Sequence, residues 1–126
     1  MNSNIFYMQT TIKFIAFLYL FIITFALLIP LDFYLIEENI KDNQQPSKNS
    51  AFIIHLVLFF FLYLFFYYSY EYKYKIFFYC LFYAILIELL QIFTSRGFEI
   101  YDIIFNIVGL SFSFLFCGFL KKIFNY

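Results

Sequence analysis

The stretch IELLQIFTSRGFEIYDIIFN, residues 87–106, gathers polar side chains between two long apolar runs. One run ends inside this stretch and the next begins inside it, with only SRGFEIY, residues 95–101, between them. Two apolar runs joined by so short a link predict an antiparallel helical hairpin. The polar side chains should then gather at the joined end of that hairpin. They are Glu88, Gln91, Arg96, Asp102 and Asn106.

The composition of the whole chain indicates that lipid is the solvent for most of its side chains. Of the 126 residues, 65% are hydrophobic and only 13% are charged, and the mean hydropathy is +0.85. A soluble domain of this length cannot bury so much apolar surface, because small globules keep a large polar exterior. The formal net charge is zero, which argues against nucleic acid as a partner.

Four apolar stretches are long enough to cross a bilayer, which needs about 20 consecutive apolar residues. The sequence contains no internal repeat, so one integral membrane domain over residues 1–126 is expected. The predicted fold is all-α, a four-helix transmembrane bundle. Its helices are expected at about residues 12–31, 51–70, 76–95 and 102–120.

The distribution of basic residues predicts that both termini are cytoplasmic. With four spans, the termini and the EYKYK turn, residues 71–75, share one side of the membrane. Lysine and arginine near span ends favour the cytoplasmic side. The side with the termini carries Lys13, Lys73, Lys75, Lys121 and Lys122, and the other side carries Lys41, Lys48 and Arg96.

Five polar side chains from three predicted helices should lie at similar depth. At a rise of about 1.5 Å per residue, His55 and Asn106 lie roughly 6 Å below the outer surface and Glu88 lies roughly 10 Å below it. Gln91 shares a helix face with Glu88, and Asp102 shares one with Asn106, because residues three or four apart are neighbours on a helix. We therefore predict one polar site at this depth, with Arg96 above it at the turn.

Most of these residues also have a purely structural interpretation when each is taken alone. Asp102 suits the first turn of a helix, and Arg96 suits a helix end. Asn106 and Gln91 could simply join helices by hydrogen bonds. Glu88 has no such local reason, and ionisable residues inside membranes usually face the bundle interior. The set together favours a site.

Small residues follow Asn106 along the last predicted helix. Gly109, Ser113 and Cys117 form a stripe that lets another helix approach closely, and we expect helix packing from them rather than chemistry. Cys117 and Cys80 both fall near the reducing cytoplasmic face, so no disulfide is expected. The sequence contains no metal-binding motif, phosphate loop or activated nucleophile, and no metal or cofactor is expected.

The order of the polar residues resembles the VanZ-like family, which are small bacterial membrane proteins named after a protein associated with low-level teicoplanin resistance. The similarity covers about residues 50–118, and the first helix matches only as a hydrophobic segment. Family members often carry Asp-Lys before the histidine and Tyr four residues after it, where this chain has Ala51, Phe52 and Phe59. The resemblance rests on His55, the E-x-x-Q of Glu88 and Gln91, Arg96, and the D-x-x-x-N-x-x-G of Asp102, Asn106 and Gly109.

Three functions remain open at this point. The first is binding of an amphiphile, a membrane lipid or lipid-linked envelope precursor, at the outer face of a bacterial cytoplasmic membrane; the resemblance also implies a glycopeptide resistance role. The second is a membrane enzyme in which Glu88 and His55 act as acid and base on a lipid headgroup. The third is a structural or accessory subunit whose polar residues only hold helices together. The sequence does not predict an oligomeric state.

Overall fold

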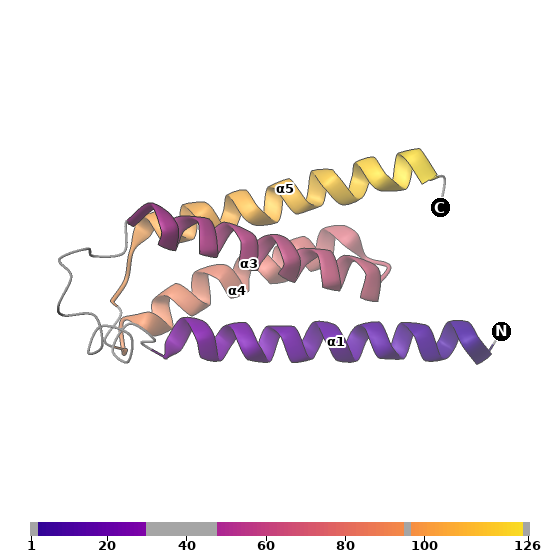
Figure 1. Cartoon of the computed structure of the whole chain (residues 1–126), viewed down its shortest axis with the longest axis horizontal. Helices are drawn as coiled ribbons and strands as arrows, with labels where there is room; N and C mark the ends of the chain where they lie inside the picture. Colours follow the sequence, from indigo (N-terminus) through magenta and orange to yellow (C-terminus); the bar gives the residue numbers. More distant parts are fainter. Residues whose placement is uncertain (1–2, 30–47, 95–96, 125–126) are drawn as a thin grey trace.

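The structure, a computed structural model, describes residues 3–29, 48–94 and 97–124. These residues form helices and short connections without any strand, which confirms the predicted all-α fold. Figure 1 shows the four helices side by side along the length of the molecule. They are α1 (Ser3–Leu28), α3 (Lys48–Ser69), α4 (Lys73–Gln91) and α5 (Ile100–Phe124).

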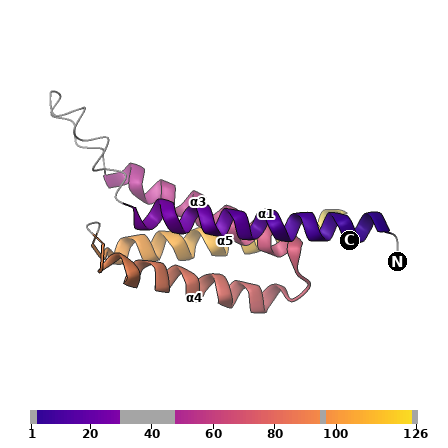
Figure 2. The same ribbon diagram turned by 90° about the horizontal axis from the view of Figure 1, so that it is seen from below.

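Both chain ends lie at the same end of the bundle, together with the turn between α3 and α4 (Figures 1 and 2). We call this the terminal end, and we call the other end, where α3 and α5 begin and α4 finishes, the opposite end. Helix α3 contacts each of the other three helices. In the described part of the chain α1 and α5 make no contact, so they lie on opposite sides of the α3–α4 pair.

All four helices are long and apolar enough to cross a membrane. Much of their outer surface consists of large apolar side chains, for example Phe21, Phe78, Phe82 and Leu115, each of which is at least 61% exposed. A surface of this kind is unfavourable in water and favourable in lipid, because burying apolar area from water is the main driving force of folding. The chain is therefore built as a membrane-spanning protein.

Helix α1 begins nine residues before the predicted start, at Ser3, and the other helix ends differ from the predicted ones by one to four residues. Helix α1 finishes at Leu28, shortly before Pro30, because the residue preceding a proline is disfavoured in helical conformation. Helix α4 finishes at Gln91 and tightens over the next residues, where Thr94 bonds back to the Gln91 carbonyl through both its amide and its hydroxyl. Helix α5 runs on to Phe124 with lysines in its last turn, which complement the helix dipole.

Helix α5 comes very close to α3 at Gly109. A Cβ atom added at Gly109 would come within 2.3 Å of the carbonyl oxygen of Leu56, so only glycine fits there at this separation. Gly118, further along the same helix, has nothing within 4 Å of the corresponding position. The two cysteines are buried and free. The Gly109–Leu56 contact holds the first turns of α3 and α5 together and thereby positions their polar side chains.

Candidate functional site

Four polar side chains from three helices meet inside the bundle at its opposite end. His55 comes from the start of α3, Glu88 from the end of α4, and Asp102 and Asn106 from the start of α5. None of the four residues is more than 9% exposed. We call these four residues the polar cluster. Their convergence follows from the alternating direction of the helices, which brings two helix starts and one helix end to the same depth.

Hydrogen bonds link three members of the polar cluster in a chain. The Nδ1–H of His55 donates to Asn106 Oδ1 over 3.0 Å. The side-chain amide of Asn106 donates in turn to Glu88 Oε1 over 3.2 Å. The same Glu88 oxygen lies 3.5 Å from His55 Nδ1, within ion-pair range. Each of the three helices therefore contributes one side chain to a single connected network.

The other ring nitrogen of His55 faces the fourth member. His55 Nε2 lies 3.4 Å from Asp102 Oδ2, and the Asp102 side chain is 12% exposed. In a neutral His55 whose Nδ1 donates to Asn106, Nε2 carries no proton and is an acceptor. It would then face the Asp102 carboxylate, which is also an acceptor. One additional proton, on His55 or on Asp102, turns this contact into a hydrogen bond. The arrangement can therefore hold a proton between His55 and Asp102, and Asp102 is the member that reaches the surface.

Gln91 does not join the polar cluster, although it was predicted there. Its side-chain amide donates to the backbone carbonyl of Leu27 on α1 over 3.0 Å. Gln91 is buried and thus fastens the end of α4 to the end of α1. Arg96, the remaining predicted member, lies outside the described residues.

Helix packing alone does not explain these residues energetically. Placing an acidic side chain at the centre of a membrane helix costs about 2.5 to 3.5 kcal/mol, and less near the membrane surface, whereas Leu contributes about −0.6 to −0.3 kcal/mol. A side-chain hydrogen bond between membrane helices stabilises by only about 0.6 kcal/mol on average. Apolar residues at Glu88 and Asp102 would join the helices at least as well, so the polar cluster is the candidate functional site.

Three members of the polar cluster could also hold a cation. His55, Glu88 and Asp102 each offer one ligand atom, and these atoms lie within 4.8 Å of one another. Three protein ligands is the number found in catalytic zinc sites. The two carboxylates face opposite ring nitrogens of His55, and one ion can bind only one of those nitrogens.

The stripe of small residues runs down the buried side of α5. Gly109, Ser113 and Cys117 are all fully buried, and Gly109 lies against the α3 backbone. This placement agrees with a packing role, and none of the three belongs to the polar cluster. The stripe explains how α5 comes close enough to α3 for Asn106 to reach His55.

Two contacts that attach α1 to the bundle were not predicted. The Tyr19 hydroxyl donates to the Leu58 carbonyl on α3 over 2.9 Å. Thr24 and Tyr83 share a hydrogen bond of 2.8 Å between their hydroxyls, which joins α1 to α4. In a chain with 13 tyrosines a single hydroxyl gives little signal in the sequence. The Thr24 position inside an otherwise apolar run was the only available sign.

The comparison with protein families extends the resemblance to the first helix. The model of the VanZ/LLP1 family matches residues 3–121, well beyond the 50–118 expected from the polar motif. No curated protein and no solved structure matches the chain. The match covers the polar cluster, all of α1, α3 and α4, and α5 as far as Lys121. The described residues include four helices able to span a membrane, and the chain belongs to the VanZ/LLP1 family of membrane proteins.

Proposed function

We propose that the protein binds the polar headgroup of a membrane amphiphile at the polar cluster. The amphiphile would be a lipid or a lipid-linked envelope precursor in the outer leaflet of a bacterial cytoplasmic membrane. The observation that carries this proposal is the meeting of His55, Glu88, Asp102 and Asn106 inside a bundle whose surroundings are apolar. Intramembrane ionisable groups arranged in this way usually serve a ligand or proton pathway.

The chemistry of the polar cluster favours a headgroup that donates hydrogen bonds. Two carboxylates and an amide oxygen are acceptors, which suit hydroxyl or ammonium groups. Asp102 reaches the surface and is the point where a headgroup can first make contact. Exposed apolar side chains next to the cluster, Ile54 on α3 and Ile104 on α5, offer a lipid-facing surface for the acyl chains.

The test is to identify the lipid that copurifies with the gently solubilised protein by native mass spectrometry. We expect the wild-type protein to retain a lipid that depends on the polar cluster, with at least about tenfold weaker retention in Glu88→Gln, because a hydrogen bond to a charged group contributes about 1.5 to 3 kcal/mol. Glu99→Gln removes the same charge from an exposed position and should retain the lipid. Absence of lipid from the wild type, or equal retention in Glu88→Gln, would refute the proposal.

A second candidate function is acid–base chemistry on the bound headgroup. The observation that favours it is His55 between two carboxylates, with a proton available at its Nε2 side. Asp102→Asn keeps an acceptor and should still bind lipid, but it should block proton transfer. An enzyme therefore predicts that lipid recovered from Asp102→Asn differs in mass from lipid recovered from the wild type. Identical masses would exclude this reaction and support lipid binding without catalysis.

The resistance role that the family resemblance implies is tested with the same variants. Cells expressing the wild-type protein should tolerate more teicoplanin than cells expressing Glu88→Gln at equal protein level. Equal susceptibility of the two kinds of cell to teicoplanin would refute the resistance role. The lipid-binding proposal would stand, because lipid binding is measured separately.

A further inference from the structure

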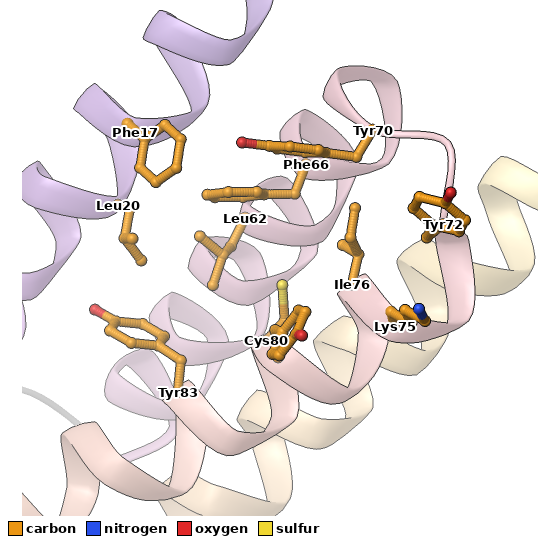
Figure 3. Close-up of a pocket in the computed structure, with 11 residues that line it drawn as sticks. Phe17, Leu20, Leu62, Phe66, Tyr70, Tyr72, Lys75, Ile76, Cys80 and Tyr83 are labelled. Atoms are coloured by element: carbon orange, nitrogen blue, oxygen red, sulfur yellow. The ribbon is translucent and has the colours of Figure 1, made fainter.

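A cavity lies near the terminal end of the bundle, away from the polar cluster. It measures about 540 Å³ and opens between α1, α3 and α4. Figure 3 shows Phe17 and Leu20 of α1 facing Leu62 and Phe66 of α3 and Tyr83 of α4 across it. We call this cavity the α1–α4 groove. None of its lining residues belongs to the polar cluster; the lining residue Tyr83 lies five residues before Glu88 on α4, about 7.5 Å at the helical rise of about 1.5 Å per residue.

Three hydrogen bonds fasten the second half of α1 to its neighbours. The hydrogen bonds of Tyr19, Thr24 and Leu27 to other helices all lie in that half. Towards the terminal end α1 and α4 diverge, as both Figure 1 and Figure 2 show. Apolar and aromatic side chains line the space that this divergence leaves.

Cationic side chains stand at one end of the groove. Lys75 lines the groove and lies 4.9 Å from the centre of the Tyr72 ring. Lys13 of α1 lies 5.2 Å from the centre of the Tyr70 ring, which also lines the groove. Two ammonium groups from different helices therefore flank the same aromatic end of an otherwise apolar cavity.

The remaining charges at this end do not neutralise those two lysines fully. Lys73 is engaged by the carbonyl oxygens of Tyr67 and Tyr70, to which its ammonium donates. Glu71 is the only acidic residue among the described residues at the terminal end. An anionic group would meet a positive surface here.

We propose that the α1–α4 groove binds one anionic phospholipid, with an acyl chain inside the groove and the phosphate at Lys13 and Lys75. A cavity of about 540 Å³ lies within the range of about 300–1,000 Å³ that is typical of sites for small ligands. The lining matches an acyl chain, and the two lysines match an anionic headgroup. This lipid comes from the leaflet at the terminal end, which is the leaflet opposite the one that serves the polar cluster.

The physics of the bilayer predicts how selective this site is. An acyl chain is as well solvated by bulk lipid as by the groove, so the chain contributes little preference. Discrimination must come from the headgroup charge, which amounts to roughly fivefold per nearby lysine. The site should therefore distinguish lipids by charge and hardly at all by chain length.

The test is native mass spectrometry of the full chain, delipidated in detergent and titrated with phosphatidylglycerol or with phosphatidylcholine carrying the same acyl chains. We expect the first phosphatidylglycerol to bind about tenfold or more tightly than the first phosphatidylcholine. Lys13→Gln and Lys75→Gln should each reduce that preference roughly fivefold. Lys122→Gln removes the same charge from the same end of the bundle but far from the groove lining, and should leave the preference unchanged.

A steric variant tests the groove itself. Cys80→Phe places a larger side chain in the lining and should weaken binding of the first lipid of either kind, whereas Leu115→Phe on the exposed face of α5 should not. The proposal would be overturned if the protein bound the two lipids with equal affinity. It would also be overturned if Lys122→Gln reduced the preference for phosphatidylglycerol as much as Lys13→Gln and Lys75→Gln do. A dimer that forms without lipid and is lost in Cys80→Phe would also overturn it, because a second copy would then fill the groove.

The two lipid sites are distinguishable by their variants. Glu88→Gln should leave the preference for phosphatidylglycerol intact, and Lys75→Gln should leave retention of the copurified lipid at the polar cluster intact. Failure of one proposal therefore does not imply failure of the other.

Discussion

The imidazole of His55 donates a hydrogen bond to the side-chain carbonyl of Asn106 over 3.0 Å, from the first turns of α3 to the first turns of α5. This bond is possible because Gly109, almost one turn further along α5, lies directly against the backbone of Leu56. Packing and site geometry therefore depend on the same crossing point. A change at Gly109 should disturb both, whereas a change inside the polar cluster should disturb only the site.

Gly109→Ala should destabilise the protein by about 1 to 3 kcal/mol, the usual effect of overpacking a tight contact. The added methyl group would come within 2.3 Å of the Leu56 carbonyl oxygen, so α3 and α5 must separate. The measurement is the midpoint of thermal unfolding in a fixed detergent. Gly118→Ala is the matched control: it has open space, and alanine favours a helix by about 0.5 to 1 kcal/mol over glycine, so its midpoint should stay or rise. Equal midpoints for the two variants would contradict the close approach.

Lys73→Met should lower the unfolding midpoint, because it removes hydrogen bonds at the turn between α3 and α4. The Lys73 ammonium donates to the carbonyls of Tyr67 and Tyr70 at the end of α3 and lies 4.1 Å from the centre of the Tyr67 ring. Hydrogen bonds to a charged group contribute about 1.5 to 3 kcal/mol, so a loss of that order is expected. Lys122→Met, on the exposed end of α5, should change the midpoint little. If the Lys73→Met protein is as stable as the Lys122→Met protein, the hydrogen bonds of Lys73 to the end of α3 do not contribute to stability.

Gln91→Met should weaken the attachment of α1 to α4 while the polar cluster keeps its bound lipid. The Gln91 amide bonds to the Leu27 carbonyl, and one such bond between membrane helices contributes about 0.6 kcal/mol on average. A small fall in unfolding midpoint with retained lipid is therefore expected, as read by thermal unfolding and native mass spectrometry on one preparation. Loss of the lipid at an unchanged midpoint would place Gln91 in the binding site after all.

Single cysteines test the proposed orientation. In a background without Cys80 and Cys117, a cysteine at Glu99 should react with an impermeant maleimide on intact cells, and one at Tyr74 should not. Both positions are exposed, at opposite ends of the bundle, and Glu99 avoids the positive φ of 76° found at Gly97. Labelling at Tyr74 alone would invert the topology and move the polar cluster to the cytoplasmic side.

Hydropathy was sufficient to predict the four membrane-spanning helices found among the described residues and the hairpin between α4 and α5. The requirement for about 20 apolar residues per span leaves few alternatives in a chain this apolar. Helix ends were predicted less well because they depend on local features, such as Pro30 after α1 and the tight turn after Gln91. The meeting of His55, Glu88 and Asn106 at one level of the bundle also followed from the sequence, because the position of a residue along a helix depends only on helical rise.

The direction of each side chain around its helix was harder to predict. Glu88 and Gln91 are neighbours on one helix face, yet Glu88 meets α5 and Gln91 meets α1. Which neighbour each side chain meets depends on how α1 packs, and α1 carries few polar residues to indicate that. The α1–α4 groove could not be predicted for the same reason, since it arises from the angle between two helices rather than from any motif.

The most direct test of the proposed site compares Glu88→Leu, His55→Ala and the double variant. Each protein is measured twice: by thermal unfolding after delipidation and by retention of the copurified lipid. Leu inserts into a bilayer more favourably than an acid, so Glu88→Leu should unfold at or above the wild-type midpoint while losing the lipid. Since Glu88 and His55 lie 3.5 Å apart in one network, the double variant should bind no worse than the poorer single variant. A lower midpoint in Glu88→Leu, with lipid retention falling only as the folded fraction falls, would contradict the account and make the polar cluster a structural link between helices.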